Sequence, residues 1–190
     1  MDKKIKNSPT FKITTAAILF ALIIVMQLIK NISAFISGPV INAAMVIAIT
    51  QLGTWWGVGF SIIVPVSALI ISPASPIVML AGATHYLTLP IIIIGNLLLV
   101  FAAKLGSKKG IVVFIISLII GAVLKWLFMW GCGNYILLPL FSEKLGKLAA
   151  VVTKVFSTLQ LYSGLLSVIL IVPIQKALDK IYGKNDKVRS

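Results

Sequence analysis

A single lysine lies inside a long apolar run of this 190-residue chain. Lys125 interrupts the otherwise uncharged segment GIVVFIISLIIGAVLKWLFMWGCG, residues 110–133. About 20 apolar residues span the ~30 Å hydrocarbon core of a bilayer, so this segment is long enough to cross one. A charge held there is costly and usually faces a protein interior or watery cavity with a partner. The apolar runs contain no Asp or Glu. We therefore expect the anion to come from a ligand, as a carboxylate or phosphate.

Two structural roles for Lys125 compete with ligand binding. The side chain could snorkel outward, since Gly131 follows six residues later, about 9 Å along a helix. It could instead cap carbonyl groups of a neighbouring helix. The same helical face favours a pocket wall, because it combines small residues with aromatic or soft ones: Gly121, Ala122, Phe128, Met129 and Cys132.

Other polar side chains lie in or beside the apolar runs. Asn96 is central in its run, and Asn42 occupies a comparable place. A mid-membrane amide usually hydrogen-bonds another helix, and ligand contact is the alternative. Asn134 and Tyr135 follow the run of Lys125, and Gln160 lies near one end of the last run. These five residues are candidates for a polar site.

Catalysis finds little support in the sequence. The single histidine, His85, is an interfacial residue or a turn cap, with a proton relay as the alternative. The four acidic residues, Asp2, Glu143, Asp179 and Asp186, all lie outside the apolar runs. No catalytic constellation or metal-ligand cluster is evident, and no G-x-x-x-x-G-K-[ST] motif is present. We expect no enzyme activity, no cofactor and no metal, and ATP hydrolysis would require another protein.

The composition indicates a membrane protein. Hydrophobic residues make up 59% of the chain, charged residues 11%, and the mean hydropathy is +1.10, whereas soluble domains are about 25% charged. The net charge of +13 would suggest nucleic acid if it formed a patch on a soluble domain. The lysines instead gather at the ends of apolar runs, where they set topology and contact anionic headgroups. We expect a lipid bilayer and no nucleic acid as partner.

Six spans can be placed, and they predict an all-α membrane protein with one compact bundle over residues 1–180. The predicted spans cover approximately residues 11–30, 39–53, 55–71, 85–104, 110–131 and 156–176, with a polar tail at 181–190. Pro39 can open the second span, because the first residues of a helix do not need their N–H. Gly57, Gly59 and Pro65 predict close packing and a kink in the third.

The positive residues predict the orientation of the spans. With both chain ends inside, 12 of the 17 Lys and Arg residues lie on the cytoplasmic side. Four lie outside: Lys30, Lys144, Lys147 and Lys154. This bias favours an even number of spans with cytoplasmic N- and C-termini in a multi-pass protein.

An alanine pair marks the first span. Ala17 and Ala21 form an AxxxA motif on one helical face. Small residues at this spacing let the backbone of another helix approach closely in lipid. Packing within the bundle and docking of a separate protein are the two alternatives.

Together these features resemble the substrate-binding S component of an energy-coupling factor (ECF) transporter, a vitamin importer of prokaryotes. The resemblance covers essentially the whole chain: its length, six spans, cytoplasmic ends and the Ala17/Ala21 pair. The segment Gly38-Pro39-Val40-Ile41-Asn42, residues 53–59 and residues 90–96 are similar to the pantothenate-type branch of the family.

The resemblance implies a mechanism and a localisation in the plasma membrane of a prokaryote. The subunit would bind a vitamin from outside, and Ala17 and Ala21 would dock it on a transmembrane coupling subunit. Two ATPase subunits would then drive its reorientation. The positions that the resemblance implies for substrate binding are Asn42, His85 with the connector that begins at residue 72, Asn96, Lys125, Asn134, Tyr135 and Gln160.

Neither the resemblance nor the charge of Lys125 identifies the ligand. Lys125 fits an anionic vitamin such as pantothenate, and folate, niacin or biotin would satisfy the same charge requirement. Two other functions stay possible at this point: a structural or assembly membrane subunit without a ligand, and a small stand-alone facilitator.

Overall fold

The computed structural model describes residues 8–30 and 33–183, and this part of the chain is built from helices. The long helices are α2 (Pro9–Ile29), α3 (Ala34–Ile47), α4 (Thr54–Ile71), α6 (Thr88–Gly106), α7 (Ile111–Cys132) and α10 (Thr158–Gly183). The short helices are α5 (Pro76–Ala83), α8 (Leu138–Leu145) and α9 (Leu148–Phe156), with π-helical turns η1 (Ala48–Leu52) and η2 (Gly133–Leu137). Six helical stretches among the described residues are long and apolar enough to cross a membrane. The predicted all-α, six-span fold is confirmed.

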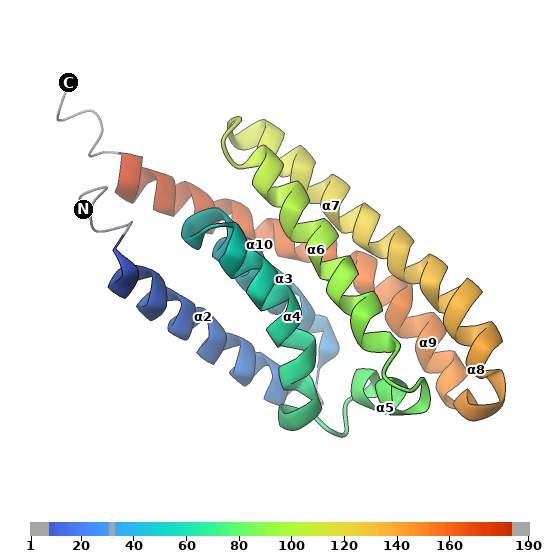
Figure 1. Ribbon diagram of the computed structural model, residues 1–190. Helices are drawn as coiled ribbons and strands as arrows, with labels where there is room; N and C mark the ends of the chain where they lie inside the picture. The colour runs from blue at the N-terminus through green and yellow to red at the C-terminus, as the bar shows by residue number, and fades with distance from the viewer. Residues whose placement is uncertain (1–7, 31–32, 184–190) are drawn as a thin grey trace.

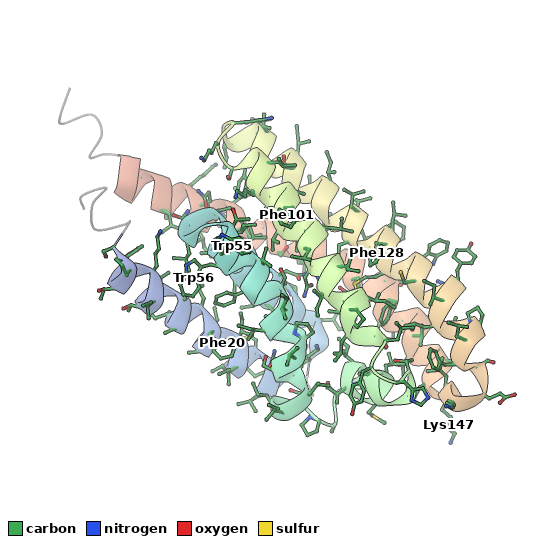
Figure 2. All side chains as sticks on the ribbon, in the orientation of Figure 1. Phe20, Trp55, Trp56, Phe101, Phe128 and Lys147 are labelled. Atoms are coloured by element: carbon green, nitrogen blue, oxygen red, sulfur yellow. The ribbon has the colours of Figure 1, made fainter. Side chains whose placement is uncertain are left out.

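The long helices run alternately up and down in one bundle (Figure 1). The start of α2, the end of α10 and the turn between α6 and α7 lie at one end of the bundle. Helices α5, α8 and α9 lie at the other end, which we call the connector end. Lys147 marks this end in Figure 2. Three short helices therefore cover one mouth of the bundle.

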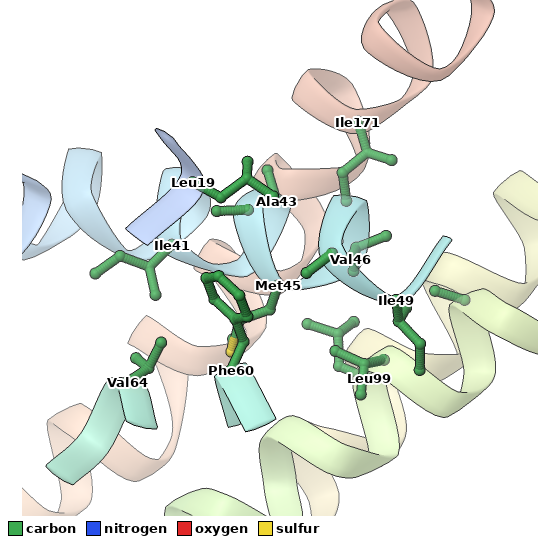
Figure 3. Close-up of a cluster of buried hydrophobic side chains, with 14 of the residues drawn as sticks. Leu19, Ile41, Ala43, Met45, Val46, Ile49, Phe60, Val64, Leu99 and Ile171 are labelled. Atoms are coloured by element: carbon green, nitrogen blue, oxygen red, sulfur yellow. The ribbon is translucent and has the colours of Figure 1, made fainter. Parts of the chain in front are cut away.

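The core is centred on α3. In the apolar stretch Phe35–Leu52, which α3 and η1 form together, 61% of the residues are buried inside the protein, compared with 22% in α2. Figure 3 shows side chains from α2, α3, η1, α4, α6 and α10 converging there. Met45, Ile49, Leu99 and Ile171 are among the most deeply buried of them. The outer faces of the helices carry exposed Ile, Leu and Val side chains, which suits contact with lipid.

Several helix boundaries differ from the prediction, and α10 extends to Gly183 rather than ending near residue 176, so the predicted tail begins as helix. Helix α3 begins at Ala34, so Pro39 lies inside it and is not its opening residue. A proline there costs the hydrogen bond to one carbonyl, and the helix tolerates this near its start. The fourth span begins at Thr88 rather than near His85. His85 and Tyr86 have φ values of 47° and 62°, and this left-handed backbone separates α5 from α6.

Helix α4 approaches η1 closely at Gly57. A Cβ added at Gly57 would overlap the side chain of Ile49, whereas a Cβ at Gly59 would meet nothing within 4 Å. The close packing predicted for both glycines therefore applies to Gly57 alone.

This difference predicts that a Gly→Ala substitution has opposite effects on stability at Gly57 and at Gly59 of α4. Gly→Ala improves helix propensity by about 1 kcal/mol, but overpacking a tight contact costs about 1–3 kcal/mol. We expect Gly59→Ala to keep or raise the melting temperature in detergent and Gly57→Ala to lower it. Equal melting temperatures of the two variants would contradict the close contact.

Candidate functional site

Lys125 points into the bundle from the middle of α7. Its side chain is 3% exposed. Its ammonium donates to Asn42 Oδ1 of α3 and to Asn96 Oδ1 of α6, both at 2.8 Å. Three helices that are distant in sequence thus meet at this one nitrogen, and the side chain does not snorkel to an interface.

Lys125 borders a cavity of about 70 Å³ that side chains from α2, α3, α4, α5, α6, α7 and α10 enclose. One water needs about 10–15 Å³ on this measure, so the space corresponds to roughly five to seven waters, or about 150–200 Å³ of liquid. That is the size of a small organic acid. The polar residues that line the cavity are Gln27, Lys30, Asn42, Asn96, Lys125, Gln160 and Ser163.

The hydrogen-bond partners of Lys125 are neutral. Asn42 uses its amide nitrogen to donate to Ser163 Oγ at 3.3 Å, and Ser163 Oγ donates to the Gln160 carbonyl at 3.2 Å. Amide oxygens orient an ammonium but do not cancel its charge. An ammonium has three donors, and the two asparagines accept from two of them. None of the described residues that line the cavity carries a carboxylate.

Pro65 explains why the amide of Asn96 presents its oxygen to Lys125. Proline has no N–H, so Pro65 leaves the Ser61 carbonyl of α4 without its usual helical donor. Asn96 Nδ2 donates to this carbonyl at 3.4 Å. With the nitrogen turned toward α4, Asn96 Oδ1 faces Lys125 Nζ. The proline thus positions a site residue on a different helix.

Gly95 lets α6 approach the lysine. A Cβ at Gly95 would lie 3.0 Å from Met129 Cγ and 3.5 Å from Lys125 Cγ. The first distance is tighter than ordinary packing and the second is normal van der Waals contact, so a side chain at position 95 would force Met129 of α7 to shift. The absence of a side chain here brings Asn96, the next residue, within hydrogen-bond distance of Lys125.

Four of the seven predicted substrate-binding residues line the cavity. They are Asn42, Asn96, Lys125 and Gln160. They come from α3, α6, α7 and α10, and the lysine and the two asparagines are joined directly by hydrogen bonds. Their contact with a ligand stays a prediction.

The other three predicted residues lie outside this cavity. His85 is exposed, and its Nε2 lies 2.7 Å from Lys144 Nζ of α8. Asn134 Nδ2 of η2 donates to the Trp130 carbonyl of α7 at 2.8 Å. Tyr135 is 73% exposed. His85 and Tyr135 are exposed and Asn134 is half-buried, and none of the three is among the residues that line the cavity.

Three polar lining residues were missed by the sequence analysis: Gln27, Lys30 and Ser163. Gln27 is a polar residue within an apolar run, which was an available signal, and its Nε2 donates to the Val64 carbonyl at 2.8 Å. Lys30 was considered only as a topology marker. It directly follows α2, and burial lowers the pKa of its ammonium to about 8, so it is still mostly protonated at pH 7.

The AxxxA pair lies on the outer surface of α2. Ala17 and Ala21 are both exposed, so no helix of the described chain covers the pair. Ala17 also borders an apolar groove between α2 and α4, together with Phe20 and Trp56, both labelled in Figure 2. This face is open to lipid or to another helix.

No metal site competes with the cavity as a candidate. In the part of the chain that the structure describes, no three His, Cys, Asp or Glu side chains gather closely enough to hold a metal ion. Comparisons with family models, with curated proteins and with solved structures found no match. Function must therefore be inferred from the cavity and from the pattern of residues along the chain.

Proposed function

We propose that this protein is the substrate-binding subunit of a membrane importer and that it holds a small anionic organic molecule beside Lys125. The observation that carries the proposal is the uncompensated charge of this lysine. Its side chain is 3% exposed, and among the described residues its ammonium donates only to amide oxygens. A buried charge is strongly unfavourable without a counter-charge. A ligand carboxylate would supply that counter-charge.

The remainder of the wall suits a small organic ligand. Ile41, Met45, Ile92 and Leu159 provide apolar contact around the polar cluster. Mostly apolar walls with a few convergent polar groups are typical of small-molecule sites. A bare inorganic ion would leave this apolar surface unused.

The importer part of the proposal rests on the resemblance to ECF S components. The chain has no nucleotide-binding motif, so a transmembrane coupling subunit and two ATPase subunits would supply the energy. The exposed Ala17/Ala21 face is the docking surface in this proposal. The protein would lie in the plasma membrane of a prokaryote with both termini cytoplasmic. Its ligand would then enter from outside at the connector end, and pantothenate is the vitamin that the resemblance favours.

A ligand screen tests the proposal directly. Purified protein in detergent is mixed with pantothenate, niacin, biotin and folate, and with panthenol as the uncharged counterpart of pantothenate. A ligand at one hundred times its Kd stabilises by about 2.7 kcal/mol, which raises the melting temperature by about 5–10 °C for a chain of this size. We expect such a shift with an anionic compound and none with panthenol.

The other outcomes of the screen identify the alternatives. If no compound shifts the melting temperature, a structural or assembly subunit explains the protein better. A separate transport assay identifies the other alternative: if liposomes that contain this protein alone take up the compound without ATPase subunits, the protein is a facilitator.

A carboxylate built into the site should replace the ligand's charge. We expect Asn42→Asp to raise the melting temperature, because it forms an internal ion pair with Lys125, and to weaken anion binding by about 30-fold or more. Asn42 is preferable to Asn96 because its amide nitrogen faces the Ser163 hydroxyl, which can rotate and donate to a carboxylate. The nitrogen of Asn96 faces the Ser61 carbonyl, which would repel one.

The matched control for Asn42→Asp adds the same charge elsewhere. Ser142 is exposed on α8, and Ser142→Asp should leave both melting temperature and affinity unchanged. Binding measured by titration calorimetry decides the matter. Undiminished affinity in Asn42→Asp would show that the ligand's anion does not pair with Lys125.

A further inference from the structure

A second cation borders the same cavity. Lys30 lines it from the end of α2, where its side chain is half-buried. Within residues 8–30 and 33–183 its ammonium has neither a carboxylate nor a hydrogen-bond acceptor. Lys125 lies deeper, almost fully buried on α7. The cavity therefore presents one positive group inside and another where α2 ends.

Lys30 and Lys125 both line this cavity, so their like charges repel one another across it. In a medium of low dielectric constant such repulsion is strong, and no acidic residue among the described lining residues relieves it. A ligand with one negative charge would neutralise Lys125 and leave Lys30 uncompensated. A ligand with two would neutralise both.

The surfaces of the cavity also suit an extended ligand. Besides the polar cluster at Lys125, the wall includes apolar side chains of α3, α4, α5, α6 and α10, among them Met45, Ala68 and Leu159. An apolar wall with positive groups at different depths matches a molecule whose acidic groups are separated by a carbon segment.

We propose that the ligand is a small dianion with an acidic group at each end, such as a dicarboxylate with an apolar middle. One carboxylate accepts from Lys125 inside the bundle and the other accepts from Lys30. This inference rests on the proposed function because it concerns the same cavity. It narrows the substrate class from anions in general to dianions, and it ranks a monoanion such as pantothenate below them.

The test compares diacids with monoacids of the same length. Titration calorimetry of the full chain in detergent at pH 7 would use straight-chain α,ω-dicarboxylates of four to eight carbons and the matching monocarboxylates. The wild type should bind the best diacid about tenfold more tightly than its monoacid, as one additional charged hydrogen bond would give. Lys30→Gln should reduce this preference to less than about threefold, and Lys30→Arg should retain most of it.

The outcomes separate this inference from the proposed function. Lys147→Gln, at an exposed lysine of the connector end, should leave the preference unchanged. If mono- and dicarboxylates bind equally and Lys30→Gln changes neither, the dianion inference is overturned while anion binding stands. If neither class binds, the dianion inference is overturned, and the vitamin screen described above decides whether the proposed function stands.

Discussion

Lys125→Met should weaken binding of the anionic ligand by about 30-fold to several thousand-fold. Removing one partner of a buried charge pair costs about 2–5 kcal/mol, and every 1.4 kcal/mol is about a factor of ten. Methionine has similar length and needs no counter-charge. It leaves the two asparagine oxygens without a donor, but it also removes a desolvated cation. We therefore expect the melting temperature of the ligand-free protein to change little or to rise.

Two further variants isolate the role of charge. Lys125→Arg keeps the charge in a larger side chain and should lose less affinity than Lys125→Met. Lys147→Met removes a lysine that is exposed at the connector end and should bind like the wild type. Titration calorimetry gives the affinities, and thermal unfolding shows that each variant is folded. Wild-type affinity in Lys125→Met would remove the basis for an anionic ligand.

Replacing both alanines of the AxxxA pair by tryptophan should abolish uptake and leave ligand binding unchanged. Ala17 and Ala21 are exposed on α2, so two indole rings can be accommodated without entering the bundle. The same rings would prevent the close helix contact that small residues permit. The measurement is transport of labelled ligand into proteoliposomes that contain the coupling and ATPase subunits, alongside binding to the isolated variant.

A tryptophan on a distant lipid-facing surface is the matched control. Val112 of α7 is 65% exposed, and Val112→Trp should transport normally. Normal uptake by the Ala17→Trp/Ala21→Trp variant would rule out docking through this face. Loss of binding together with uptake would indicate misfolding instead, and single substitutions would then be compared.

The six membrane-spanning helices could be predicted because each span is a long apolar run, whereas the short helices α5, α8 and α9 were not predicted. The apolar run around Lys125 also indicated a buried cation with polar neighbours in other spans. Asn42 and Lys125 lie 83 positions apart in the chain, so no local pattern could show that they form a hydrogen bond. Their membership of one cluster follows from how α3 and α7 pack.

The parts that sequence reasoning missed depend on contacts between helices. Lys30 looks like any topology lysine at the end of a span, and only the fold turns it toward the cavity. Pro65 predicted a kink, but its effect on Asn96 requires α6 to lie beside the freed Ser61 carbonyl. His85, Asn134 and Tyr135 have suitable chemistry, yet they lie in the turn at residues 85–86 and in the π-helical turn η2, and none of them lines the cavity.

Helix α5 closes part of the cavity, since Ile77 belongs to the lining. Its Leu80 is fully buried in the apolar cluster shared with α8 and α9. A molecule that leaves past this helix would first have to displace Leu80 from that cluster. Residence time would then depend on a local opening rather than on the strength of the ionic contacts, so two cargoes of different affinity would escape at similar rates.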